Sequence, residues 1–128
     1  GNPVSCAAAL AVMDIMKRDD YAGKARHIGE VVMKRYNELK DKYEVVGDVR
    51  GLGAMIGIEL VKDKESKEPA TEIASKLIYN AMQKGLLLES CGTASNVIRF
   101  LAPLTMTDEQ MAKGLEIFEE SLKEAIAD

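Results

Sequence analysis

The chain has 128 residues, the size of one ordinary domain, and its 47% hydrophobic and 30% charged residues exclude a disordered protein. The formal net charge is −4, and the 17 Lys and Arg residues are scattered among 21 Asp and Glu residues, which argues against nucleic acids and acidic membranes as partners. No apolar run approaches the roughly 20 residues that span a bilayer.

A first helix is predicted over about residues 3–17, because Asn2 is a good N-cap and Pro3 fits the first helical position. Its residues are apolar on nearly every face, which is typical of a helix that is buried all round. One small domain covers only one side of such a helix, so we expect a partner, either another domain or another subunit. Because the helix starts at once and no initiator Met precedes it, we also expect a fragment of a longer chain.

A second, amphipathic helix is predicted to begin after Asp19 and Asp20 and to end near Lys42. The period of the apolar residues then changes, which predicts strands at about 44–50 and 54–61, followed by a charged loop at 62–69. A third helix is predicted at 71–84 and is stopped by Gly85. Two strands at 86–89 and 97–101 flank a turn-rich loop at 90–96, and a capping box of Thr107 and Gln110 opens the last helix. The order α-α-β-β-α-β-β-α predicts an α+β fold, with helices on one face of a mostly antiparallel sheet.

Arg99 is the most informative side chain. It lies inside the predicted strand 97–101, and strand alternation places it on one face with the aliphatic residues at the two ends of that strand. Arginine cannot lose its proton, so its guanidinium needs an anion there. One such anion is a ligand carboxylate, held by both prongs of the guanidinium. The alternative, which the pattern alone favours, is a salt bridge to Glu59 or Glu89 on a neighbouring strand.

The other candidate side chains have ordinary interpretations. Arg50, beside a glycine turn, could mark a second anion site, but a solvated arginine at a strand end is the favoured interpretation. His27, the only histidine, is predicted to be a solvated or half-buried helix residue. Cys6 and Cys91 are interpreted as free thiols in a reducing cytoplasm, and the spacings of a metal site are absent. No lysine lies in an apolar setting that would desolvate its amine, so we expect no catalytic residue.

Several stretches of the chain, taken together, resemble one family. They are the opening GNPVSCAAA at 1–9, GDVRGLGAMIGIEL at 47–60, GLLL at 85–88, Cys91-Gly92, and NVIRFLAPLT at 96–105. In the same order, these stretches are similar to segments of the class III aminotransferases. The resemblance covers essentially all 128 residues.

The resemblance implies that residues 1–128 are the C-terminal small domain of an α+β, fold-type-I enzyme, with helix 1–17 between two domains. It implies a cytoplasmic homodimer whose pyridoxal phosphate is bound to a lysine of a large domain upstream. No cofactor-binding residue is therefore expected here, and the cofactor is not expected on this chain alone. By its place in the motif, Arg99 matches the arginine that binds the substrate's α-carboxylate, which reverses the preference for a salt bridge.

The resemblance also implies the substrates, which are small amino acids and 2-oxo acids. The spacing from Cys91 to Arg99 is most similar to that of the 4-aminobutyrate branch, with glutamate and 2-oxoglutarate as the exchange pair. An acetylornithine or ornithine aminotransferase is the alternative within the family. A free-standing α+β module that binds a small carboxylate through Arg99, or that serves oligomerisation, is the alternative from another class.

Overall fold

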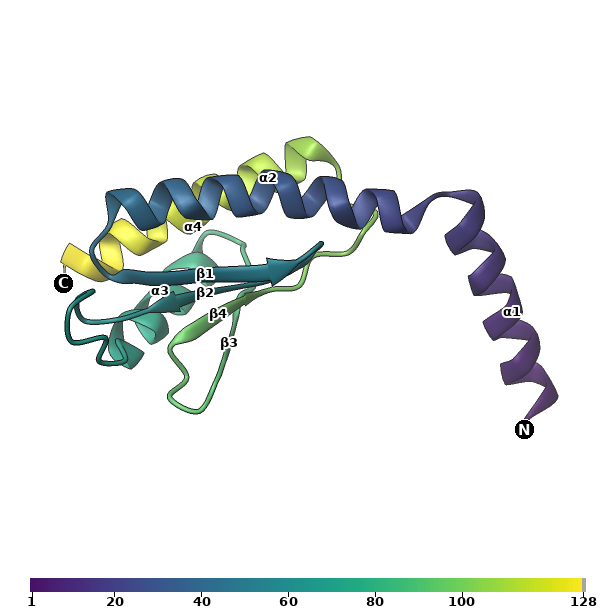
Figure 1. Ribbon diagram of the computed structural model, residues 1–128, viewed down its shortest axis with the longest axis horizontal. Helices are drawn as coiled ribbons and strands as arrows, with labels where there is room; N and C mark the ends of the chain where they lie inside the picture. The colour runs from purple at the N-terminus through teal and green to yellow at the C-terminus, as the bar shows by residue number, and fades with distance from the viewer. Residues whose placement is uncertain (128) are drawn as a thin grey trace.

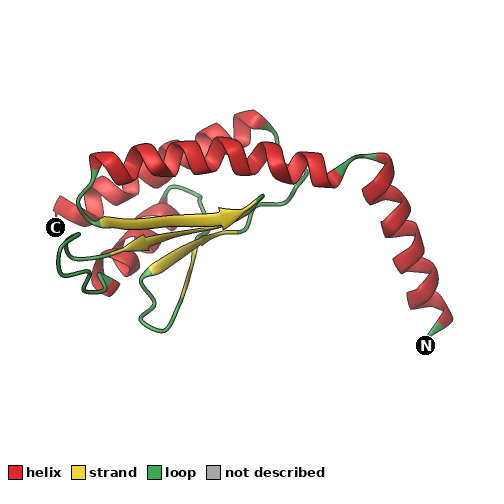
Figure 2. Cartoon of the chain, viewed as in Figure 1, coloured by secondary structure: helices red, strands yellow, loops and turns green. Residues whose placement is uncertain are grey.

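The computed structural model describes residues 1–127, which form four helices and one four-stranded sheet (Figure 2). In chain order the elements are α1 (Pro3–Arg18), α2 (Tyr21–Lys42), β1 (Val46–Leu52), β2 (Met55–Leu60), α3 (Thr71–Gln83), β3 (Glu89–Cys91), β4 (Val97–Phe100) and α4 (Asp108–Ala127). The predicted α+β fold and its element order are confirmed.

The strands are arranged in the order β1-β2-β4-β3, and every neighbouring pair is antiparallel. In the middle of the sheet Ile58 pairs with Val49 on one side and with Ile98 on the other. All three are buried on the face that α2, α3 and α4 cover, as Figure 1 shows. The next row, Arg50, Gly57 and Arg99, points to the opposite face because side chains alternate along a strand.

The core is aliphatic, and its helical part follows the predicted stripes. In α4 the stripe Met111, Leu115, Phe118, Leu122 and Ala125 is entirely buried, and in α2 Ile28, Val32, Tyr36 and Leu39 are buried. Burying each large apolar side chain stabilises the fold by roughly 1.5–3 kcal/mol. The predicted capping box is also present, because Thr107 and Gln110 exchange two hydrogen bonds of 3.1 and 3.2 Å.

Two predicted strands lie at other residues. The strand predicted at 86–89 is misplaced, since β3 is Glu89–Cys91 and its last two residues lie in what was predicted as loop. Leu86, Leu87 and Leu88 instead line a cleft beside the sheet. The strand predicted at 44–50 begins two residues later, at Val46, and continues to Leu52.

The turn between β1 and β2 is packed tightly against α2. A Cβ atom on Gly29 would lie 2.4 Å from the backbone oxygen of Gly53, so no larger residue fits without moving the backbone. Gly53 itself has φ +55°, the left-handed region that favours glycine. This close approach of two glycines fixes the β1–β2 hairpin, and through it the register that places Arg50 and Arg99 on one row.

Helix α1 stands apart from this body (Figure 1). None of its residues is buried, and Val4 and Leu10 are 78% and 64% exposed. The prediction of a helix that is buried all round is therefore not met within residues 1–127. An exposed apolar helix of this kind is typical of an interaction site. That another domain or subunit covers α1 stays a prediction.

Candidate functional site

Arg99 lies near the end of β4, on the sheet face that the helices leave open. Its side chain is 41% exposed. The strand ends at Phe100, and Leu101 lies beyond it, 59% exposed. The register pairs Arg99 with Gly57 on one side and with Glu89 on the other.

The partner of Arg99 within the chain is Glu89, directly opposite on β3. The Nη2 of Arg99 donates a hydrogen bond of 2.5 Å to Oε2 of Glu89, and this hydrogen bond raises the pKa of Arg99 above its ordinary value. The salt bridge weighed as the alternative from the sequence is therefore present. Both side chains are largely exposed, and exposed pairs of this kind contribute only about 0–1 kcal/mol, so a ligand carboxylate can displace Glu89 at little cost.

One N–H of Arg99 has no partner. Its Nε is buried and makes no hydrogen bond to any residue that the structure describes. A buried donor left unpaired costs about 1–3 kcal/mol, and such groups in native proteins need an explanation.

A cleft of about 350 Å³ adjoins Arg99 and Glu89. Both residues line it, together with mainly apolar residues of α2, β4, α4 and the chain before β3 and after β4: Tyr36, Leu86, Leu87, Leu88, Phe100, Leu101, Ala102, Pro103, Met106, Gln110, Met111, Gly114, Leu115 and Phe118. A concave apolar surface with a few convergent polar groups is typical of a small-molecule site.

Arg50 is 54% exposed, which agrees with the favoured interpretation of a solvated arginine. It lies inside β1 rather than at its end, and its guanidinium is held by two carboxylates. Its Nη1 donates to Oε2 of Glu59 at 2.6 Å and to Oδ2 of Asp48 at 3.0 Å, and these hydrogen bonds raise the pKa of Arg50.

The remaining candidates lie away from the cleft. Nε2 of His27 lies 2.8 Å from Oδ1 of Asp108 and joins α2 to the start of α4, so His27 is an exposed helix residue as predicted. Cys6 and Cys91 are free thiols, exposed and half-buried respectively. Within residues 1–127 no group of three His, Cys, Asp or Glu residues could hold a metal ion, and no helix is long and apolar enough to cross a membrane.

Every lysine of this chain is half-buried or exposed, and none is buried. Among the lysines that form ion pairs, Lys84 has the least exposed side chain, at 28%. Its Nζ donates hydrogen bonds to both carboxylate oxygens of Glu124, at 2.7 and 2.8 Å. A lysine that attacks a carbonyl needs a desolvated amine, and the expectation that this chain supplies none stays a prediction.

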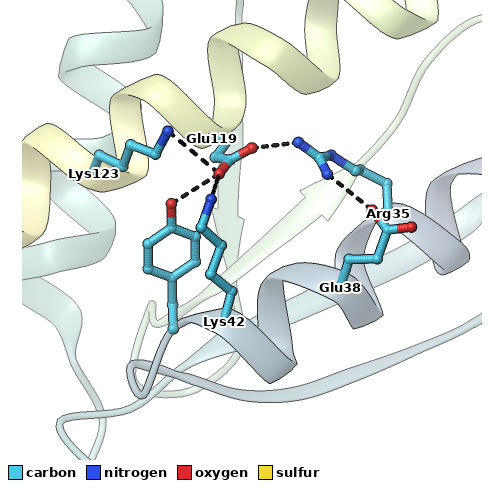
Figure 3. A network of polar contacts seen from close by, with 6 residues as sticks. Arg35, Glu38, Lys42, Glu119 and Lys123 are labelled. Atoms are coloured by element: carbon cyan, nitrogen blue, oxygen red, sulfur yellow. Dashed lines mark hydrogen bonds and ion pairs between the residues drawn. The ribbon is translucent and has the colours of Figure 1, made fainter.

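A second charged cluster, which the sequence did not reveal, joins α2 to α4 (Figure 3). Glu119, only 9% exposed, accepts hydrogen bonds from Lys42 at 2.6 Å, from the hydroxyl of Tyr43 at 2.9 Å and from Arg35. Lys123 lies 3.4 Å away. The hydrogen bond from Lys42, with the other partners, lowers the pKa of Glu119 to about 2 against the cost of burial. The cluster lies outside the cleft and stabilises the helix layer.

The sequence contains one signal that could have revealed this cluster. Glu119 follows Phe118 directly and lies three residues before Leu122, so it borders the apolar stripe of α4 rather than its solvated face. Its three partners in and after α2 are 76 to 84 residues away, and no local pattern indicates such a pairing.

Comparison with known proteins connects this geometry to a family, because residues 1–122 match the family described as Aminotransferase class-III. The chain belongs to the class-III aminotransferase family. The 5-aminovalerate aminotransferase of Pseudomonas aeruginosa is 44% identical over 124 residues, which are 97% of this chain and 29% of that protein. The 4-aminobutyrate aminotransferase of Escherichia coli is 40% identical over 125 residues, which are 98% of this chain and 29% of that protein.

The fold of this class-III aminotransferase chain is similar to that of solved transaminases. An amine transaminase from an uncultivated Pseudomonas species, in its pyridoxal-phosphate-bound form, matches with a TM-score of 0.84 and 33% identity, over 96% of this chain and 28% of that chain. The chain thus spans less than a third of the length of these relatives. The family is pyridoxal-phosphate-dependent.

Proposed function

We propose that this chain is the C-terminal small domain of a pyridoxal-phosphate-dependent transaminase. The enzyme would move an amino group from 4-aminobutyrate or a similar ω-amino acid to 2-oxoglutarate. The observation that carries this proposal is the family match over residues 1–122, together with about 40% identity to enzymes named for 4-aminobutyrate and 5-aminovalerate. Both named substrates are unbranched amino acids with a carboxylate at the far end.

Within this enzyme, Arg99 would bind the substrate's carboxylate. Its guanidinium is half-exposed on the open sheet face, and its one internal ion pair is exposed and weak. A carboxylate fits a guanidinium fork with two parallel hydrogen bonds. The carboxylate meant is the α-carboxylate, that of glutamate in the second half-reaction, and binding it would hold the adjacent reacting carbon at the cofactor, which residues outside this chain would anchor.

The bare helix α1 and the open face of the sheet would be covered by the large domain and by the second subunit of a homodimer. Val4 and Leu10 on α1, and Leu52 and Met55 at the tip of the β1–β2 hairpin, are all more than half exposed. Covering such residues would remove apolar surface from water at about 25 cal/mol per Å².

An assay of the full-length polypeptide that contains this chain tests the proposal. The purified protein, supplied with pyridoxal phosphate and 2-oxoglutarate, should form glutamate from 4-aminobutyrate or 5-aminovalerate. Acetylornithine and ornithine, tested in parallel, would reveal the other branch of the family if they are the better donors. A protein that forms no glutamate from any of these amines would contradict the proposal.

A further inference from the structure

Helices α1 and α2 meet at a sharp bend, with only Asp19 and Asp20 between them (Figure 1). No side chain of α1 is buried. In the part of the chain that the structure describes, no hydrogen bond or ion pair joins α1 to a residue beyond Asp20. The direction of α1 is therefore set by the backbone of these two residues and not by packing against the sheet or its helices.

Asp20 performs two tasks that usually need two residues. It follows the end of α1 in the left-handed conformation, with φ 44° and ψ 57°, where glycine or asparagine is the usual residue. It also caps α2, because its Oδ1 accepts a hydrogen bond of 3.0 Å from the N–H of Gly23. Glycine takes the same backbone conformation but lacks the carboxylate, so aspartate meets both requirements.

Gly23 leaves the space that this cap needs. A Cβ atom at position 23 would lie 2.1 Å from Oδ2 and 2.8 Å from Cγ of Asp20, so a larger residue would push the carboxylate out of place. Glycine inside a helix ordinarily costs stability relative to alanine. Here that cost is offset by the cap, and the identity of Gly23 is tied to the carboxylate of Asp20.

We propose that Asp19 and Asp20 form a rigid elbow, that Asp20 fixes its bend, and that Gly23 makes room for the cap. A second part of the proposal rests on the function proposed above, in which α1 joins the small domain to the rest of a transaminase. The elbow then sets how Arg99 faces the cofactor. Asp20 is in this sense a positioning residue, which acts through α1 and touches no substrate.

The distance between spin labels on the two helices tests the elbow in the 128-residue chain, whose hydrophobic core includes no residue of α1. One label is placed on the exposed native Cys6 and the other on Lys34→Cys, with Cys91→Ser. Asp20→Asn should keep the single short distance of the bent chain, because asparagine also tolerates the left-handed conformation and caps helices. Asp20→Ala should favour one continuous helix, in which the labelled residues lie about 42 Å apart at 1.5 Å per residue.

Asp19→Ala is the matched control for this measurement. Asp19 has a right-handed backbone conformation, φ −99° and ψ 10°, and its carboxylate pairs with Arg18. Its substitution should leave the distance between the labels unchanged. The same distance in Asp20→Ala as in Asp19→Ala would overturn the proposal, and so would a broad distribution of distances with Asp20 in place, because it would show a flexible joint.

The dependence of Gly23 on Asp20 gives a second test, by urea unfolding of the same chain. Gly23→Ala should lower the urea midpoint by roughly a few tenths of 1 M, because the added Cβ displaces the capping carboxylate. In the background of Asp20→Gly, which has no carboxylate, Gly23→Ala should raise the midpoint by roughly as much, because alanine is the better helix former. Equal shifts in the two backgrounds would refute the role assigned to Gly23.

The positioning role is measured in the full-length enzyme. Asp20→Ala should lower kcat/KM for glutamate about tenfold, because left-handed alanine is disfavoured by about that factor or more, whereas Asp20→Asn and Asp19→Ala should keep the wild-type value. Equal kcat/KM in Asp20→Ala and Asp19→Ala would overturn this role, and this pair also decides the matter if Asp20→Ala of the 128-residue chain does not fold. A full-length protein without transaminase activity would contradict the proposed function, while the label distances and the urea midpoints still decide whether the elbow exists.

Discussion

Replacing Glu119 by Gln should destabilise the helix layer substantially, although the side chain keeps its shape. The variant leaves Arg35, Lys42 and Lys123 without the carboxylate that they surround. The pKa of Glu119 is lowered from 4.5 to about 2, and each pKa unit corresponds to about 1.4 kcal/mol of stability. The ionised Glu119 therefore stabilises the fold by at most roughly 3 kcal/mol. Because Lys42 and Lys123 are 56% and 53% exposed, water screens part of this stabilisation. We expect a loss of about 2 kcal/mol at pH 7.

The sign of the pH dependence follows from the direction of the shift. The folded state keeps Glu119 ionised to a lower pH than the unfolded state does, so the stabilisation is complete above about pH 5.5. It is lost as the pH falls from the unfolded pKa of 4.5 to the folded value of about 2. Urea unfolding of wild type and Glu119→Gln at pH 7, 4 and 3 should therefore show a difference in unfolding free energy that shrinks by more than half between pH 7 and pH 3.

Glu116→Gln is the matched control for this experiment. Glu116 lies on the same helix, is 65% exposed and has a single distant partner, Lys113 at 3.5 Å. Its substitution should change the unfolding free energy by less than about 0.5 kcal/mol. A loss this small for Glu119→Gln, or a loss that stays the same down to pH 3, would refute the reasoning about the cluster.

Three further substitutions test the packing, each by urea unfolding. Gly29→Ala should lower the unfolding free energy by about 2 kcal/mol or more, because its Cβ would lie 2.4 Å from the oxygen of Gly53; a neutral result would mean that the contact is loose. Asn96→Ala should cost about 1–3 kcal/mol, since the buried amide donates to the Leu60 oxygen at 2.7 Å. Gly85→Ala should cost about 1 kcal/mol because Gly85 has φ +84° after α3, and a stabilised variant would contradict that backbone assignment.

The helical part of this fold could be predicted from the sequence because its signals are local. The stripe from Met111 to Ala125 recurs at helical spacing, and the cap formed by Thr107 and Gln110 lies within one turn. The edge strand was misplaced for a physical reason. Leu86 to Leu88 form an apolar run that resembles a strand, but these side chains line a cleft, and pairing begins only where Glu89 meets Arg99.

The candidate site was predicted in part. Strand alternation identified Arg99 as a charged residue that needs an anion, and Glu89 was one of the two partners considered. The exposure of Arg99 and its unpartnered Nε depend on where β4 ends and on how far 86–88 and 100–103 separate. These are properties of tertiary structure that residue spacing does not encode.

The central claim is that Arg99 binds the carboxylate of the substrate. The most direct measurement is kcat/KM for glutamate in the full-length enzyme, for wild type, Arg99→Lys and Arg50→Lys, with the unfolding free energy of each. Arg99→Lys should lower kcat/KM by about tenfold or more, because lysine lacks the fork that holds two oxygens, with less than about 1 kcal/mol of stability lost. Equal losses of kcat/KM in the two variants, or a loss in Arg99→Lys that merely follows its stability, would contradict the claim.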